Sequence, residues 1–131
     1  EACLVVYDPA VVTYARLAAV MFDRIPDPTM VNRVGKDRGS QYRTGLFVHA
    51  EGEMGRARRA YAVENRMWKS SGREVTTEVT SMTGTPTEMD DGPLLFWPAE
   101  EGHQRYLAKG GSYGRPQSDA VGCTDEVRCY G

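Results

Sequence analysis

The residues best suited to chemistry lie in one short stretch, Gly35–Arg43, which reads Gly-Lys-Asp-Arg-Gly-Ser-Gln-Tyr-Arg. It brings a carboxylate, a phenol, an amide and two guanidinium groups together between two apolar segments. Such groups cost free energy to bury, so a stretch this rich in them is either a solvated turn or a binding surface. Residue types alone favour the solvated turn, and the wider sequence must decide between the two.

Cysteine supplies the other reactive groups of the chain, which has three. Cys3 lies in the apolar run Ala2–Tyr7 and is expected to be a buried, inert thiol. Cys123 and Cys129 lie in a polar, glycine-containing tail, where reversible redox chemistry suits them better than a structural role. Two incidental thiols in an unstructured end are one alternative. Zinc is another, although the spacing is not Cys-x-x-Cys.

Composition describes one soluble domain. The chain has 131 residues, of which 40% are hydrophobic and 26% charged, and its net charge is −2. This balance gives no electrostatic case for nucleic acid. The basic run Gly55–Arg59 has acidic residues near it and indicates a solvated helix face. No apolar run approaches the roughly 20 residues that a membrane span needs, so no membrane partner is expected.

Periodicity and helix breakers predict the elements around the Gly35–Arg43 loop. Ala2–Tyr7 is a short apolar run that indicates a buried strand. Thr13 can cap a helix, which must end before Pro26 because proline donates no backbone hydrogen bond. Tyr42–His49 alternates between two faces and indicates a second strand directly after the loop.

The second half of the chain continues this alternation. Helical spacing over Glu51–Ser70 predicts the longest helix, and Gly72 suits its end. The later segments predict a strand over Arg73–Met82, a turn-rich connection, a strand over Leu94–Trp97, a helix over Ala99–Lys109 and a tail over Gly110–Gly131. The pattern favours an α+β domain with a mixed β-sheet and flanking helices.

The loop and the strand after it resemble a known family. Asp-x-Gly-Ser-Gln-Tyr-Arg followed by Thr-Gly-Leu-Phe is similar to the signature of the A-type peptide methionine sulfoxide reductases. Further segments agree in order: Glu1–Pro9, Asp27–Arg33, Phe96–Leu107 and the tail Lys109–Gly131, which resembles that of plant and algal members. The resemblance implies an α/β roll around a mixed sheet.

The resemblance also implies a reaction. A-type enzymes reduce methionine-(S)-sulfoxide, free or in proteins, to methionine. A cysteine thiolate attacks the sulfur, and the oxygen must be protonated to leave. The enzyme is left as a sulfenic acid, which a second thiol converts to a disulfide. A thioredoxin-like dithiol then resets the enzyme, and no bound cofactor or metal is implied.

Family roles carry over to five positions of this sequence. Glu1 matches the glutamate that protonates the sulfoxide oxygen. Asp37 matches the aspartate that helps order the site, and Tyr42 matches the tyrosine that hydrogen-bonds the substrate oxygen. Cys123 and Cys129 match the two recycling cysteines of plant-like members.

One family motif is absent. The family opens with Gly-Cys-Phe-Trp, whose cysteine is the nucleophile, and these 131 residues contain no such sequence. We therefore expect a fragment truncated at the N-terminus: an incomplete reductase domain over 1–109 and a flexible tail over 110–131. We expect no turnover by the chain as it stands.

Two other functions remain open at this point. The chain could be a non-catalytic member of the fold that binds oxidised methionine or partner proteins. It could also be a small thiol-redox or metal-binding module that uses only Cys123 and Cys129. For the reductase, the expected partners are oxidised proteins or free methionine sulfoxide and a thioredoxin-like reductant. A monomer in the cytoplasm or a plastid is expected.

Overall fold

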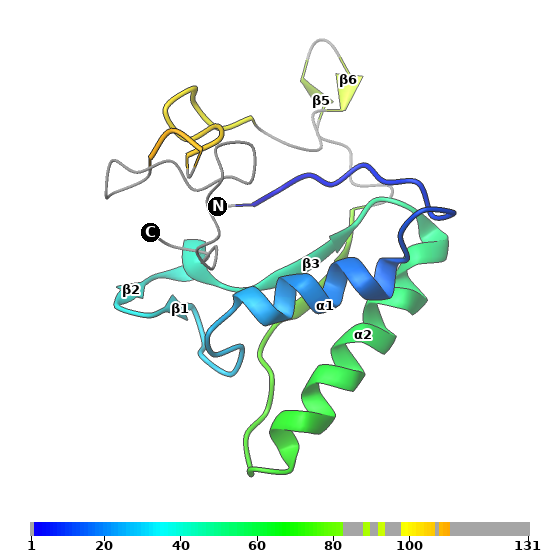
Figure 1. Cartoon of the computed structure of the whole chain (residues 1–131), viewed down its shortest axis with the longest axis vertical. Helices are drawn as coiled ribbons and strands as arrows, with labels where there is room; N and C mark the ends of the chain where they lie inside the picture. Colours follow the sequence, from blue (N-terminus) through cyan, green and yellow to red (C-terminus); the bar gives the residue numbers. More distant parts are fainter. Residues whose placement is uncertain (1, 83–87, 90–91, 94–97, 107, 111–131) are drawn as a thin grey trace. The chain divides into compact units, whose positions relative to one another are not determined.

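The computed structural model describes residues 2–82, 88–89, 92–93, 98–106 and 108–110, and it is drawn as a ribbon in Figure 1. The chain divides into two compact units, Glu1–Leu95 and Phe96–Gly131. All helices and strands of the described part belong to the first unit. The predicted tail 110–131 contributes only Gly110 to the described residues, so its boundary stays a prediction.

The first helix, α1, spans Tyr14–Arg24, as its capping signal predicted. The Thr13 hydroxyl accepts a hydrogen bond from the backbone N–H of Arg16 at 3.2 Å, which satisfies one of the free donors of the first turn. The helix ends at Arg24, and the extended backbone of Ile25 leads into Pro26.

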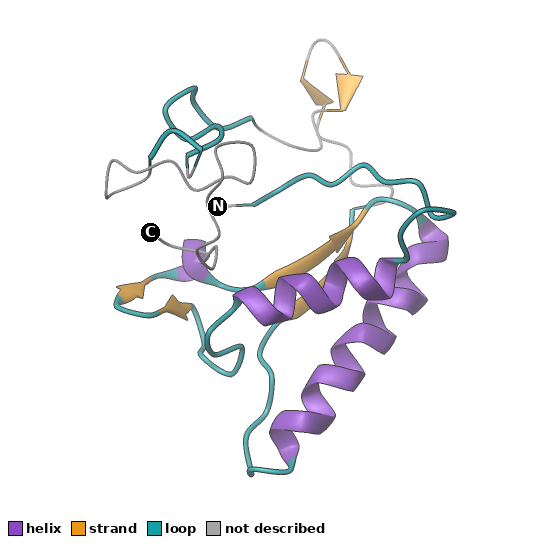
Figure 2. Ribbon diagram, viewed as in Figure 1, coloured by secondary structure: helices purple, strands orange, loops and turns teal. Residues whose placement is uncertain are grey.

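A strand, a helix and a second strand form the centre of the first unit. Strand β3 spans Gly45–Val48, α2 spans Glu51–Lys69 and β4 spans Glu78–Ser81 (Figure 2). The strands pair in parallel, with Leu46 opposite Val79. Parallel neighbours need a long crossover, and α2 supplies it. None of the helices in the described ranges is long and apolar enough to cross a membrane.

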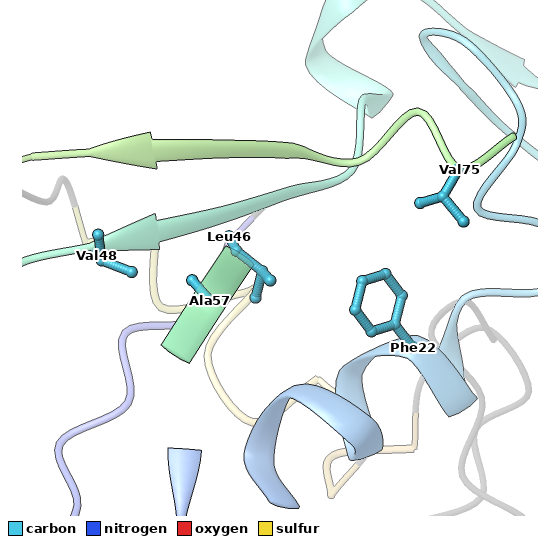
Figure 3. Packing of buried hydrophobic residues seen from close by; sticks show 5 residues of the cluster. All are labelled: Phe22, Leu46, Val48, Ala57 and Val75. Atoms are coloured by element: carbon cyan, nitrogen blue, oxygen red, sulfur yellow. The ribbon is translucent and has the colours of Figure 1, made fainter. Parts of the chain in front are cut away.

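The core lies between this ladder and the two helices. Figure 3 shows its five buried residues: Phe22 of α1, Leu46 and Val48 of β3, Ala57 of α2, and Val75 from the segment that enters β4. Tyr14, Met54, Tyr61 and Trp68 pack around them. The strand predicted over Tyr42–His49 is confirmed only for Gly45–Val48, where Leu46 and Val48 are buried and Phe47 is exposed. Tyr42 lies in a 3-10 turn instead of on this strand.

Short antiparallel pairs complete the strands of the described residues. β1 (Arg33–Val34) pairs with β2 (Asp37–Arg38), and β5 (Glu88–Met89) pairs with β6 (Gly92–Pro93). A 3-10 turn, η1, spans Ser40–Tyr42. The α+β class is thus confirmed, with parallel and antiparallel pairings in separate two-stranded sheets rather than in one mixed sheet.

The predicted strand over Ala2–Tyr7 is wrong for this structure. Residues 2–7 form no ladder with any other described segment, and Val6 is 91% exposed. Cys3, predicted to be buried, is an exposed free thiol. A strand without a neighbour leaves its backbone groups to water, so the apolar pattern alone cannot bury these side chains.

Two later predictions also need correction. Only Glu78–Ser81 of the predicted strand Arg73–Met82 enters a ladder. The helix predicted over Ala99–Lys109 is wrong for the described residues of that segment: residues 101–106 and 108–109 form turns, and Arg105 has a positive φ of 52° that interrupts a right-handed helix. The predicted strand Leu94–Trp97 lies outside the described residues.

Shortening Val48 tests the core. Val48 is 1% exposed, so Val48→Ala removes two methyl groups from a packed site and should lower the free energy of unfolding by about 2 kcal/mol. Val63→Ala is the matched control, because Val63 is 60% exposed on α2 and should cost less than about 0.5 kcal/mol. Urea unfolding followed by circular dichroism measures both, and equal losses would contradict this core.

Candidate functional site

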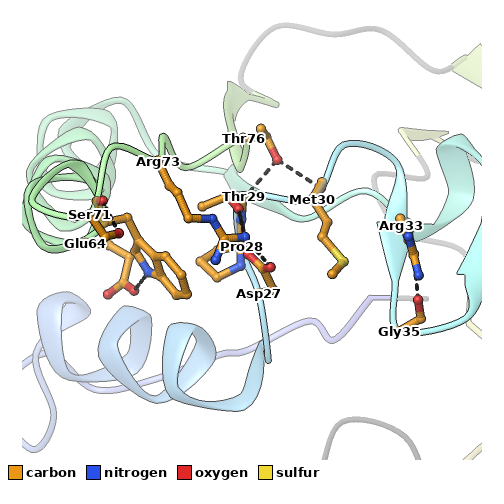
Figure 4. A network of polar contacts seen from close by, with 11 residues as sticks. Asp27, Pro28, Thr29, Met30, Arg33, Gly35, Glu64, Ser71, Arg73 and Thr76 are labelled. Carbon is orange, nitrogen blue, oxygen red and sulfur yellow. Dashed lines mark hydrogen bonds and ion pairs between the residues drawn. The ribbon is translucent and has the colours of Figure 1, made fainter.

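The first half of the Gly35–Arg43 stretch is a hairpin. β1 and β2 pair through Val34 and Asp37, leaving Gly35 and Lys36 as the turn. Gly35 has a φ of 57°, a left-handed conformation that glycine adopts without a steric cost. The Arg33 side chain also donates to the Gly35 carbonyl at 2.6 Å (Figure 4). Asp37 is therefore presented on an exposed strand of fixed register.

The second half of the stretch is the η1 turn, which carries Tyr42. The Tyr42 N–H donates to the Gly39 carbonyl at 3.0 Å, and the Gly39 N–H donates to the Asn32 carbonyl at 2.9 Å. Gly39 has a φ of 137°, which side-chain-bearing residues rarely adopt. These bonds tie the turn to the hairpin. Tyr42 is 36% exposed, so its ring is partly covered.

Arg43 holds the end of the turn against the parallel ladder. Its side chain donates to the Ser40 carbonyl at 2.9 Å and forms an ion pair with Glu78 of β4 at 2.8 Å. Its guanidinium lies 5.9 Å from the ring centre of Phe47. The residue directly after Tyr42 is thereby fixed from three sides, which limits how far η1 can move.

A second set of contacts anchors the loop where it leaves α1. Figure 4 shows that Asp27 accepts hydrogen bonds from the backbone and hydroxyl of Thr29 and from the Arg73 guanidinium. Arg73 in turn lies 4.9 Å from the ring of Trp68. The Thr76 N–H donates to the Pro28 carbonyl at 2.8 Å, with Pro28 fully buried. Residues 27–30 are thus joined to residues 73–76.

The anchor favours the charged form of Asp27. Partial burial raises the pKa of the Asp27 carboxyl, but hydrogen bonds from Thr29 and Arg73 outweigh that effect and hold the pKa below its ordinary value. The anchor should therefore keep its charge at any pH above the ordinary range of an aspartate.

A small open pocket of about 90 Å³ lies between the loop and the ladder. Its walls combine apolar side chains, hydroxyl groups and the ion pair, contributed by Met30, Val31, Asn32, Arg43, Thr44, Thr76 and Glu78. Arg43 and Thr44 directly follow Tyr42, so the chain that leaves η1 lines this pocket.

The structure places some of the predicted site residues and not others. Asp37 and Tyr42 lie on β2 and η1, two elements that contact each other. Glu1, Cys123 and Cys129 lie outside the described residues, so their roles stay predictions. In the described ranges, no group of three or more His, Cys, Asp and Glu residues could hold a metal ion.

Sequence reasoning missed the two ion pairs that fix the loop. The Asp27-Pro28-Thr29 sequence is a recognisable turn signal, because an aspartate commonly bonds the backbone two residues on. Its partner Arg73 lies 46 positions away, however, and carries no local signal. The partner of Arg43 is Glu78, 35 positions away, and the same limit applies.

Replacing Gly39 tests whether η1 needs its unusual backbone. Gly39→Ala forces a side chain into a φ of 137° and moves Gln41, since the new Cβ would collide with the Gln41 side-chain amide. We expect a loss of about 1–3 kcal/mol in the free energy of unfolding. Gly55→Ala, in the helical α2, is the control and should stabilise by about 0.5–1 kcal/mol. An unchanged Gly39→Ala protein would refute the role of this turn.

The Asp27 anchor predicts a pH dependence. Because the folded pKa is lowered, its stabilisation is full above the ordinary aspartate pKa of about 3.9 and is lost as pH falls through the lowered value. Asp27→Asn should cost about 1–2 kcal/mol at pH 7. Urea unfolding measures the free energy of unfolding of both proteins, and the difference between wild type and variant should shrink below about pH 4.

The matched control for this anchor is Asp23→Asn. Asp23 is on the exposed end of α1, 3.6 Å from Arg24, and its loss should cost less than about 0.5 kcal/mol at pH 7. The free energy of unfolding of the wild type minus that of Asp27→Asn should not stay constant down to pH 2.5, about 1.4 units below the ordinary aspartate pKa. A constant difference would contradict the lowered pKa of Asp27.

Comparisons with known proteins agree with the motifs of the loop. A family model described as peptide methionine sulfoxide reductase matches residues 1–126. A peptide methionine sulfoxide reductase of Solanum lycopersicum is 37% identical over 131 residues, which are 100% of this chain and 60% of that protein. Peptide methionine sulfoxide reductase A4, chloroplastic, of Arabidopsis thaliana is 38% identical over the whole chain, which covers 45% of it.

A crystal structure of Mxr1 from Saccharomyces cerevisiae in reduced form aligns with 72% of this chain and 56% of that chain, with 25% identity and a TM-score of 0.49. The chain spans about half the length of the curated relatives it matches. Because the family model covers nearly every residue and the alignments with these relatives span the whole of this chain, the chain belongs to the peptide methionine sulfoxide reductase family.

Proposed function

We propose that this chain forms the substrate-facing part of a reductase that converts methionine-(S)-sulfoxide, free or in proteins, to methionine. The observation that carries the proposal is the family match over residues 1–126. Within these residues, the loop that carries Asp37 and Tyr42 is held by hydrogen bonds and an ion pair, with Asp37 exposed and Tyr42 partly exposed. A held loop is what a binding site needs, because a preorganised donor loses little entropy on binding.

The proposed reaction needs a thiolate and a proton source. The thiolate of a Gly-Cys-Phe-Trp segment attacks the sulfoxide sulfur, and the oxygen takes up one proton as it passes from the methionine sulfur to the cysteine sulfur. Tyr42 would donate a hydrogen bond to that oxygen without carrying charge. Asp37 would order the site, and Glu1 would supply the proton. Methionine leaves, and the attacking cysteine keeps the oxygen as a sulfenic acid.

Recycling would use the tail. One of Cys123 and Cys129 would condense with the sulfenic acid, releasing water and forming a disulfide. The other would pass that disulfide to a thioredoxin-like dithiol, which is oxidised in turn. We propose a monomer, acting in the cytoplasm or a plastid, and the name of the chloroplastic relative supports the second compartment.

The proposal separates substrate binding from turnover. These 131 residues contain no Gly-Cys-Phe-Trp, so the chain by itself should bind a sulfoxide weakly and reduce none. Joined to a preceding segment with that motif, taken from the Solanum lycopersicum relative, it should reduce the (S) epimer only. Reduction driven by dithiothreitol is measured by chromatography of each epimer of an N-acetylated, C-amidated methionine sulfoxide.

Variants of the joined protein assign the roles. Tyr42→Phe should lower kcat/KM about 10²-fold or more, as loss of an oxygen-directed donor does elsewhere. Tyr106→Phe is the matched control, an exposed tyrosine of the second unit, and should leave kcat/KM unchanged. Cys123→Ser and Cys129→Ser should abolish turnover with thioredoxin but spare it with dithiothreitol. Stereospecific reduction by the 131 residues alone would falsify the proposed need for the added motif.

A further inference from the structure

The methionines of the chain differ in their exposure. The structure describes the side chains of Met21, Met30, Met54, Met67 and Met82. Met21 and Met54 pack against the core, and Met30 lines the small pocket. Met67 alone among the methionines with described side chains is largely open to solvent, at 58% exposed.

The position of Met67 on α2 explains its exposure. Ala57, Tyr61 and Trp68 face the core from one side of this helix. With 3.6 residues per turn, position 67 lies about 100° from position 68, on the flank away from that face. Val63, one turn earlier, is exposed on the same side. Met67 thus lies on the exposed flank of α2, and it is not among the residues that form or pack against the core cluster.

We propose that Met67 is a site of reversible oxidation. Hydrogen peroxide, the oxidant class for this step, transfers one oxygen atom to the thioether: a sulfur–oxygen bond forms, the oxygen–oxygen bond breaks and water leaves. The sulfur loses two electrons, and the peroxide gains them. Susceptibility follows exposure, so Met67 reacts in the folded chain before the partly buried methionines do.

The fold tolerates this product at Met67 but not in the core. A sulfoxide is polar and disrupts a packed apolar site, as at Met54, which lies against the buried cluster. At Met67 the new oxygen points to water and displaces no core contact. Oxidation there can accumulate without unfolding, which leaves an intact protein to be repaired.

The repair step rests on the proposed function. Met67 sulfoxide is then a protein-bound substrate of the family's own reaction, supplied by this chain to another reductase molecule. A dithiol provides the two electrons, the oxygen leaves as water and a disulfide forms. An A-type enzyme accepts one sulfoxide epimer, so roughly half of a mixture of epimers returns to methionine.

Peptide mapping tests the proposal on the chain as it exists. Cleavage after glutamate separates Met54, in residues 54–64, from Met67, in residues 65–74. After brief treatment with hydrogen peroxide, the second peptide should gain one oxygen several-fold faster than the first, because Met54 is partly buried against the core. Fragmentation of the peptide assigns the oxygen to Met67 rather than to Trp68.

Conservative variants and unfolding make the result specific. Met67→Leu should remove the fast oxidation event, whereas Met54→Leu, on the same helix, should keep it; both swaps conserve volume. In concentrated urea the two methionines should react at equal rates, and the singly oxidised chain should keep its melting temperature within about 2 °C. Equal rates in buffer, or a large loss of melting temperature, would overturn the proposal.

The reduction arm separates this proposal from the proposed function. The oxidised chain is incubated with the Solanum lycopersicum relative and dithiothreitol, and the Met67 peptide is followed. Partial return to methionine supports repair. Fast oxidation without any return would leave the oxidation site intact and overturn its reversibility, whatever the activity of the joined protein proves to be.

Discussion

The contact between residues 27–30 and residues 73–76 is the constraint on which the rest of this structure depends. It joins the end of α1 to the segment that enters β4, through a charged pair, a buried Pro28 and a backbone bond from Thr76. Helix α1 also packs directly on α2, and this contact adds a second attachment next to the end of the helix that carries Phe22. The hairpin that presents Asp37 begins only three residues beyond this contact, so the anchor also sets where the candidate site starts.

The loop itself combines two kinds of restraint. Glycine at 35 and 39 permits backbone angles that other residues resist, and this shapes the hairpin and the η1 turn. The ion pair of Arg43 with Glu78 then ties the shaped loop to β4. Shape alone would leave Tyr42 free to move with its turn. The ion pair connects the turn that carries Tyr42 to β4, which packs against the core.

Local signals in the sequence were enough to predict α1, α2 and the position of the loop. Thr13 marked the start of α1, periodicity marked α2, and the Gly-Ser-Gln-Tyr-Arg run marked the candidate site. Pairing was harder to predict. The apolar run Ala2–Tyr7 has the pattern of a strand, but a strand also needs a neighbouring strand. The residues of the run do not predict which segment that neighbour would be. The same holds for Arg73, whose partner lies far along the chain.

The parallel ladder has a consequence for the order of folding. Thr44 and Thr77, whose hydroxyls meet at 2.8 Å beside it, are 33 positions apart, so β4 cannot join β3 until a long loop has closed. Helix α2 fills most of that loop and, once formed, turns a flexible chain into a rod roughly 28 Å long. After that, β4 reaches β3 through conformational changes in the two segments that join α2 to these strands. The rate at which this chain folds should depend on α2 more than its share of the buried surface suggests.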